Sequence, residues 1–420
     1  MMIFTSLYSI VDGLFISNFA GKDAFASVNF IFPLIMLIGG LGFMMGAGGS
    51  ALVCKIRGAG DPVKANKIFG FLALCTLILG LVMAGVGIAL IRPVAKVLGA
   101  TSEMMPYVVT YGTIMLCGMP LFMLQNFFQS FLIAAERPRL GLVATLCSGF
   151  GNIIGDALLV GLFKLGIVGA ASATVTAYAI GTIIPLIHFL NKKSDCWLKL
   201  SSISIDFKAL GQTVWNGLSE LVSNIAMSVV GLLYNYELLR YFGEDGVSAY
   251  GVIMYVGFIF VAIFIGYSMG VAPIISYNYG AQNHNELHNV FKKSLVFIAI
   301  SSVAMVVLAE GLAYPISSIF VGYDSELMNL SIKGMMIYFI GYAFCGFSIF
   351  GSNLFTALNN GTISSIVSVS RTLVFESTCI VVLPLIFGRE LIFASYAVAE
   401  FLSVIINFVF IWVYRKKYHY

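Results

Sequence analysis

The chain has 420 residues, of which 60% are hydrophobic and only 10% are charged, and its formal net charge at pH 7 is +4. Soluble domains carry about 25% charged residues, so this composition excludes a soluble enzyme or binding domain and favours a polytopic membrane protein. The small positive net charge does not indicate nucleic-acid binding, because the longest basic run is the three-residue tail Arg415–Lys417.

Apolar runs of about 20 residues, the length that crosses a bilayer as an α-helix, recur from one end of the chain to the other. They predict an all-α protein with twelve transmembrane helices, over residues 2–20, 25–54, 68–91, 107–134, 140–163, 166–190, 209–239, 247–276, 291–314, 328–357, 363–387 and 391–414. No polar anchor precedes the first run. We therefore expect the first helix to be truncated at its start, with the natural polypeptide beginning upstream of Met1.

The Lys and Arg residues are distributed unevenly between the two sides of the predicted membrane. Fifteen lie in loops on the side of the C-terminal tail and six on the opposite side, while Lys333 and Arg371 fall within spans. Cytoplasmic loops carry the excess of basic residues in membrane proteins. This asymmetry predicts that both termini are cytoplasmic.

The sequence contains an internal repeat with an offset of 222 residues. At this offset Gly21-Lys22-Asp23 matches Gly243-Glu244-Asp245, the GAGD sequence at 58–61 matches GAQN at 280–283, and Pro93 matches Pro315. Six spans separate the copies, so both halves enter the membrane from the same side. We predict an N-lobe over 1–190, a cytoplasmic linker over 191–208 and a C-lobe over 209–420. The lobes should be related by a pseudo-twofold axis along the membrane normal, with a cavity between them.

Polar residues in the first half fall at one depth of the predicted membrane. Asp12 lies eight residues before the outer end of its span, and Asp156 lies eight before the turn at Lys164. Thr174 lies eight residues after Gly166, where the next span begins, so all three sit roughly 12 Å below the outer face, with Asn152 one turn deeper. Carboxylates are costly at this depth and usually mark function. We predict a cation-coupling site at these four residues.

Charged residues of the second half fall near the middle of their spans. Arg371 needs a buried anion, which Glu400 or Glu376 can supply, and such a pair is expected to fix the register of the helices. Glu220 lies at a similar depth, where it is a candidate for contact with a substrate or a proton.

Two other motifs are better explained by a structural role than by a functional site. His284 and His288 have a spacing compatible with a metal, but the intervening Glu286 is misplaced for HExxH, and a polar loop explains them. The glycine cluster Gly39–Gly49 lies in a membrane span and favours close helix packing. No nucleophile–base pair or metal-ligand set occurs near either membrane face, so we expect no enzyme activity and no cofactor.

The motifs together resemble those of the multidrug and toxic compound extrusion (MATE) transporters, prokaryotic type, over essentially the whole chain. The matching residues are Tyr8–Gly13, the GAGD and GAQN loops, Asn152–Asp156, Asn216–Glu220, Ser370-Arg371 and Leu383–Gly388. The resemblance implies two six-helix lobes in the bacterial cytoplasmic (inner) membrane. It assigns the N-lobe cation site to Asp12, Asn152, Asp156 and Thr174, and makes Glu220 similar to a C-lobe glutamate used by some branches.

The function implied by the resemblance is secondary active efflux of lipophilic, often cationic, small molecules in exchange for H⁺ or Na⁺. The partners are then small molecules and the lipid bilayer, with no nucleic acid and no obligate protein partner. A lipid-linked oligosaccharide flippase is the alternative, because that related family shares the architecture. Such a protein would line its cavity with several Arg or Lys side chains, whereas this sequence offers only Arg371.

Overall fold

The structure is a computed structural model that describes residues 15, 22–97, 100–191, 193–200, 203–322 and 324–420, without the side chains of 22–26, 29 and 255. Throughout these residues the regular structure is helical, with no strand. The first predicted span, 2–20, lies almost wholly outside the described residues. The all-α prediction is confirmed for the described part of the chain.

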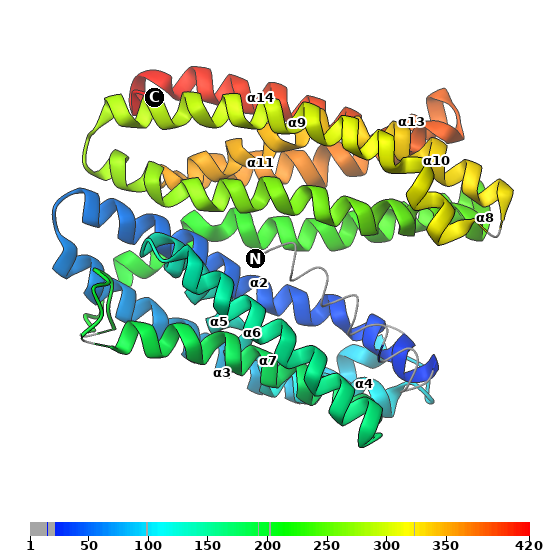
Figure 1. Cartoon of the computed structure of the whole chain (residues 1–420), viewed down its shortest axis with the longest axis horizontal. Helices are drawn as coiled ribbons and strands as arrows, with labels where there is room; N and C mark the ends of the chain where they lie inside the picture. Colours follow the sequence, from blue (N-terminus) through cyan, green and yellow to red (C-terminus); the bar gives the residue numbers. More distant parts are fainter. Residues whose placement is uncertain (1–14, 16–21, 98–99, 192, 201–202, 323) are drawn as a thin grey trace. The chain divides into compact units, whose positions relative to one another are not determined.

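The chain divides into two compact units, Met1–Gly217 and Leu218–Tyr420 (Figure 1). The first contains α2 (Lys22–Gly58), α3 (Pro62–Val97), α4 (Met105–Cys117), α5 (Met119–Ala134), α6 (Pro138–Asp156), the π-helix η2 (Ala157–Leu162), α7 (Gly166–Leu190) and the start of α8 (Phe207–Gly280). The second contains the rest of α8, α9 (His284–Val321), α10 (Ser325–Phe339), α11 (Tyr342–Ala357), α12 (Gly361–Val369), the π-helix η3 (Ser370–Glu376), α13 (Ser377–Phe387), the 3₁₀-helix η4 (Arg389–Ile392) and α14 (Ser395–Tyr418).

Eight helical segments of the described part are long and apolar enough to cross a membrane, and two bent pairs can each form one more span. The pairs are α4 with α5, bent by 49°, and α10 with α11, bent by 47°. The long α8 contains two predicted spans, 209–239 and 247–276, which meet at Gly243, where φ is 65°. Glycine accepts this left-handed conformation without steric penalty, so the chain can turn there.

The 222-residue repeat predicted from the sequence reappears in the helix boundaries. Helices end at Gly58 and Gly280, and the next helices begin at Pro62 and His284, both at this offset. The bend after Cys117 likewise recurs after Phe339. Since two sequences with little identity produce the same boundaries, the duplication is a structural one.

The surface of the helices is apolar where a bilayer would cover it. Along α3, Leu81 and Val82 are more than half exposed, and along α9 the same holds for Ile300 and Val303. A patch of this kind on a soluble protein would drive aggregation, whereas lipid tails solvate it. The backbone polar groups of these segments are satisfied inside the helices, as a membrane requires.

The predicted linker belongs to the first unit, where it packs against α3 and α7. The side-chain amide of Asn66 donates to the Trp197 carbonyl at 3.0 Å, and the backbone amide of Leu200 donates to the Phe189 carbonyl at 2.9 Å. The Arg57 guanidinium lies 4.2 Å from the centre of the Trp197 ring. The described part of segment 191–208 has no helix before α8 begins at Phe207.

The glycine cluster Gly39–Gly49 brings α2 against its neighbours, and the predicted role in close packing is confirmed. A Cβ atom on Gly42 would lie 2.7 Å from the Met123 Cα in α5, and one on Gly46 would lie 2.8 Å from the Ser130 Oγ. A Cβ on Gly48 would overlap the Thr213 carbonyl at the start of α8. Only glycine therefore allows these backbones to approach so closely.

We expect Gly42→Ala to destabilise the protein by about 1–3 kcal/mol, because the added methyl group meets backbone that cannot move aside. Gly85→Ala is the matched control, since nothing lies within 4 Å of a Cβ at that position of α3. Thermal unfolding in detergent, followed by size-exclusion chromatography, measures both variants. Equal midpoints for the two would contradict the packing assignment.

Candidate functional site

The polar residues predicted in the first unit meet between α6 and α7. Asn152 and Asp156 both lie on α6, one turn apart, and are 1% and 0% exposed. The Asn152 Nδ2 donates to the Thr174 Oγ1 at 3.4 Å, and that hydroxyl donates to the Ala170 carbonyl at 3.0 Å. The structure therefore brings three of the four predicted residues onto one helix interface. Asp12, the fourth, lies outside the described residues.

Small residues bring the two helices close enough for this contact. A Cβ on Gly155 would lie 2.9 Å from the Ala173 Cβ, and one on Gly169 would lie 2.9 Å from the Leu159 carbonyl oxygen. Close approach of backbones lets short polar side chains reach across a helix interface. The predicted turn is also present, with φ of 54° at Lys164 and 56° at Gly166.

Asp156 is followed at once by the π-helix η2, Ala157–Leu162. The i→i+5 hydrogen bonds of a π-helix leave the preceding carbonyls less well satisfied, and such segments are frequent at functional sites. The helix that carries Asp156 thus changes its winding immediately after the carboxylate.

The donor set here suits a small hard cation or a proton. Asp156 contributes a carboxylate, and Asn152 and Thr174 contribute neutral oxygens, which are the ligands that hard cations prefer. Among the described residues, the Asn152 Oδ1 has no hydrogen-bond partner although it is buried. A buried amide oxygen needs a donor or a cation, so these residues fit the predicted Na⁺ or H⁺ site.

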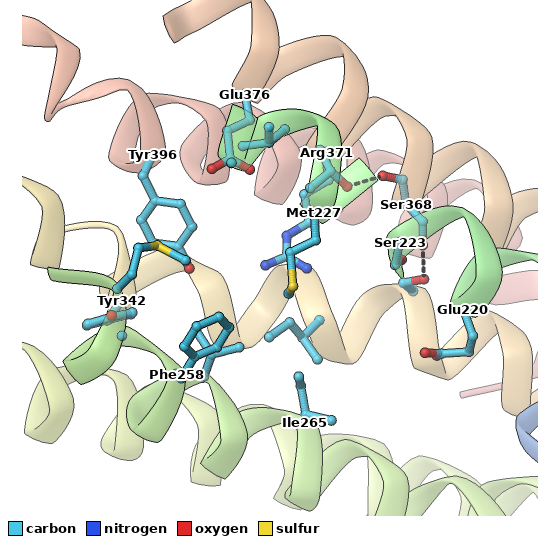
Figure 2. Close-up of a pocket in the computed structure, with 18 of the residues that line it drawn as sticks. Glu220, Ser223, Met227, Phe258, Ile265, Tyr342, Ser368, Arg371, Glu376 and Tyr396 are labelled. Atoms are coloured by element: carbon cyan, nitrogen blue, oxygen red, sulfur yellow. Dashed lines mark hydrogen bonds between the residues drawn. The ribbon is translucent and has the colours of Figure 1, made fainter. Parts of the chain in front are cut away.

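A cavity of about 170 Å³ lies inside the second unit, with room for several water molecules (Figure 2). Its walls come from α8, α10, α11, α12, η3 and α14. Glu220, Arg371 and Glu376 all line it, so three of the four charged residues predicted in the C-lobe share one cavity. Between these groups the wall is apolar and includes Met227, Phe258 and Ile265.

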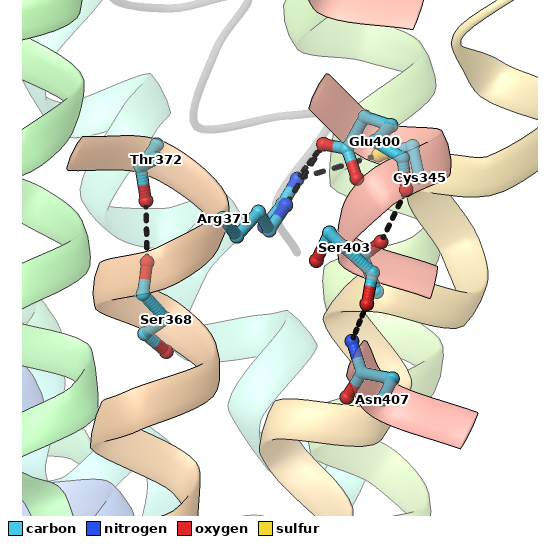
Figure 3. Close-up of polar contacts among 8 residues, drawn as sticks. Cys345, Ser368, Arg371, Thr372, Glu400, Ser403 and Asn407 are labelled. Carbon is cyan, nitrogen blue, oxygen red and sulfur yellow. Dashed lines mark hydrogen bonds and ion pairs between the residues drawn. The ribbon is translucent and has the colours of Figure 1, made fainter. Parts of the chain in front are cut away.

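The fourth charged residue, Glu400 on α14, forms an ion pair with Arg371 (Figure 3). The Arg371 Nε and Nη2 donate to the same Glu400 oxygen, Oε1, at 2.8 and 2.6 Å. The Nη2 also lies 3.6 Å from the Cys345 Sγ. Of the two predicted anions, Glu400 is the partner, and it is only 2% exposed. The predicted contact is confirmed, whereas its structural role stays a prediction.

A π-helix explains why Arg371 and Glu376 reach the same cavity. Both lie in η3, five residues apart. In an α-helix, residues five apart point about 140° away from each other. A π-helix winds more slowly, so residues five apart lie much closer to one face of the helix. The local winding therefore turns both side chains toward the cavity.

The tyrosines around this cavity were missed in the sequence. Tyr342 and Tyr396 line the end of the cavity that Glu376 occupies (Figure 2), and Tyr250 and Tyr338 line the cavity as well. The Tyr338 and Tyr396 rings stack with centroids 4.4 Å apart. The nearness of Tyr338 and Tyr342 in an apolar span was the available signal, because buried tyrosine hydroxyl groups usually find a polar partner. The two residues lie on either side of the bend between α10 and α11.

The other end of the cavity carries hydroxyl groups near Glu220. The Ser352 Oγ lies 2.7 Å from the Ser368 Oγ and 3.1 Å from the Ser364 Oγ. The Ser364 Oγ lies 2.6 Å from the Thr356 Oγ1. These hydroxyl groups satisfy one another, so the polar end of the cavity is a connected network.

The polar loop predicted at the histidine pair is wrong, because His284 and His288 lie in the first turns of α9. His284 begins α9, and its ring lies 4.6 Å from that of His419. Among the described residues, no group of three His, Cys, Asp or Glu side chains could hold a metal ion.

The sequence profile of the MatE family matches residues 1–158 and 221–379. The chain is 24% identical to the multidrug export protein MepA of Staphylococcus saprophyticus and 25% identical to that of Staphylococcus haemolyticus. Each alignment covers 99% of this chain and 92% of the relative.

Solved structures of transporters share the fold. An outward-facing multidrug resistance MATE family transporter superposes with a TM-score of 0.93 at 20% identity, covering 99% of this chain and 94% of that one. A MOP superfamily transporter from Pyrococcus furiosus gives a TM-score of 0.89 at 21% identity, covering 98% and 94%. The predicted fold class, a polytopic all-α membrane protein of MATE type, is confirmed. The chain belongs to the MatE family.

Proposed function

We propose that this protein is a secondary active transporter that exports lipophilic, often cationic, small molecules from the bacterial cytoplasm in exchange for H⁺ or Na⁺. The proposal is carried by Asp156, a fully buried carboxylate inside a membrane span that shares its helix face with Asn152. Relatives whose alignments cover 99% of the chain are named multidrug export proteins, which supports efflux as the activity.

Coupling follows from the difference between the ion-loaded and the ion-free site. A carboxylate in low dielectric is costly without a proton or a cation. An ion bound at Asp156 with the Asn152 and Thr174 oxygens therefore changes which helix packing is favoured. A substrate that favours the other packing moves outward as the ion moves inward, by alternating access.

Asp12 is part of this proposal as the second carboxylate of the site. Two carboxylates at one depth repel each other when both are ionised, and a shared proton or Na⁺ relieves the repulsion. The coupling ion is a transported species here, so no resident cofactor is part of the proposal.

The proposed orientation places both termini and segment 191–208 in the cytoplasm. The asymmetry of Lys and Arg supports it, with fifteen on that side against six on the other. We expect a single cysteine introduced at Ser202, in a background without the seven native cysteines, to resist an impermeant maleimide outside intact cells. Labelling without lysis would overturn the topology.

The alternative, a flippase for lipid-linked oligosaccharides, fits the cavity less well. Its substrate carries a pyrophosphate, which requires free Arg or Lys side chains. Arg371, the basic residue that lines the described cavity, is already paired with Glu400.

Purified protein in vesicles can separate the two activities. We expect ATP-independent transport of a cationic dye such as ethidium, and no translocation of a fluorescent lipid-linked oligosaccharide. Translocation of the lipid without transport of the dye would replace the proposed function with the alternative.

A further inference from the structure

The cavity of the second unit has a charge balance that selects its ligand. Arg371 directs two hydrogen bonds at Glu400, so its charge is compensated outside the cavity. Glu376 is 7% exposed and lines the cavity, yet within the described part of the chain it accepts no hydrogen bond and lies in no ion pair. Glu220 lines the cavity as well. Two carboxyl groups that form no ion pair in the described part of the chain thus face the cavity. A cation there would stabilise their ionised form, whereas an anion would not.

A second observation points to the ligand from the opposite wall. The Tyr342 hydroxyl belongs to a fully buried side chain that lines the cavity, and no partner contacts it among the described residues. A buried hydroxyl without a partner is costly, and a ligand that donates an N–H removes that cost. The phenol and the carboxylate together suit a donor with a positive charge.

The rings near Glu376 add an attraction of their own. The Tyr396 ring centre lies 4.4 Å from that of Tyr338 and 6.0 Å from that of Tyr342. The Tyr250 ring lies 6.3 Å from that of Tyr338. Aromatic faces attract cations, most strongly where water is excluded. Beyond the rings the cavity continues along Met227, Met254 and Phe258, which can receive an apolar group.

We propose that this cavity binds a lipophilic protonated amine, with its N–H⁺ head at Glu376 and Tyr342 among the tyrosine rings and its apolar part along the methionine wall. The inference rests on the proposed function and deepens it by naming a subsite and a substrate class. It distinguishes protonated amines from quaternary ammonium ions, which have no N–H to donate.

The test is equilibrium binding to the purified full chain in detergent, in the absence of any ion gradient. The probes are N,N-dimethylbenzylamine, which is protonated at neutral pH, its quaternary analogue benzyltrimethylammonium, and neutral benzyl alcohol. We expect the amine to bind more tightly than the quaternary ion and the alcohol to bind least. Equal binding of the three, measured by calorimetry, would overturn the proposal.

Two variants test the two walls of the site. Glu376→Gln removes the charge and should weaken amine binding at least about tenfold. Tyr342→Phe should weaken amine binding roughly three- to tenfold and leave the quaternary ion unaffected, because it removes only the N–H acceptor. Glu237→Gln is the matched control, since Glu237 is a buried carboxyl of the same unit outside the cavity wall, and it should leave binding unchanged.

Tyr342→Phe keeps the test decisive if Glu376→Gln folds poorly, because losing an unpaired buried hydroxyl does not destabilise a protein. Unchanged amine binding in either folded variant would reject the site. If amine binding is unchanged in the variants but vesicles still export the dye, the proposed function is retained and only the amine site is rejected. Amine binding that depends on Glu376, in a protein that exports nothing, would reject the proposed function and retain the site.

Discussion

Arg371→Ala is expected to lose about 3–5 kcal/mol of stability and most of the folded yield, because it leaves the buried Glu400 carboxylate without its partner. Glu400 is 2% exposed, and its Oε2 has no hydrogen-bond partner among the described residues. The two hydrogen bonds from Arg371 to Oε1 are thus the main compensation for burying this charge. Yield of monodisperse protein and its thermal midpoint measure the effect.

The double variant Arg371→Met with Glu400→Gln is the control for this prediction. Replacing both members of a buried pair by neutral groups of similar size is often neutral for stability. We expect the double variant to recover most of the folded yield. An Arg371→Ala protein that folds normally and loses transport of selected substrates would show that Arg371 acts on substrate, and the structural assignment would be wrong.

Asp156→Asn is expected to insert and fold normally, still bind the exported substrate, and show no more gradient-driven efflux than vesicles without protein. Asparagine keeps the size of the side chain but can neither take up a proton nor supply a negative charge to Na⁺. The change of helix packing on ion binding is then lost, while a substrate site elsewhere is retained. We expect Asp12→Asn to behave in the same way.

Asp206→Asn is the matched control for both variants. The Asp206 Oδ1 accepts from the Ala209 amide at the start of α8, a capping position that asparagine also fills. The same substitution there should leave transport unchanged. Wild-type efflux in both Asp12→Asn and Asp156→Asn would exclude coupling in the first unit, and Glu220 would become the leading candidate.

Much of the fold follows from the sequence, because hydrophobic length and the position of charges are strong constraints in a membrane. The turn at Lys164 and the repeat landmarks at Gly58 and Gly280 were predictable, since glycine and charge mark where helices leave the bilayer. The bend between α4 and α5 was not predicted. Gly118 separates the two helices, and the following Pro120 removes a backbone donor.

The second unit shows what a sequence pattern leaves open. Burial of Arg371 indicated that it needs an anion, but spacing alone could not decide between Glu376 and Glu400. The choice of partner depends on the π-helix η3, which turns Glu376 toward the cavity wall. Arg371 therefore pairs with Glu400 on α14. Periodicity does not reveal a π segment, because it changes the winding for only one or two turns.

The cavity inside the second unit could not be predicted from the sequence either. Its tyrosines come from α8, α10, α11 and α14, which are brought together only by the tertiary fold. The coupling role of the first unit stays a prediction for all four residues. The structure places Asn152, Asp156 and Thr174 at one helix interface, and Asp12 lies outside the described residues. The cavity predicted between the lobes likewise stays a prediction.

Simultaneous measurement of substrate and ion fluxes in vesicles tests ion-coupled export most directly. The purified chain would be reconstituted with a cationic dye at equal concentration on both sides, and a pH gradient or a Na⁺ gradient would be imposed separately. We predict that the dye accumulates against its own gradient under one of these ion gradients, and that adding dye drives the coupling ion in the opposite direction. Ion flow that needs no dye, or dye that moves only down its own gradient, would contradict the account.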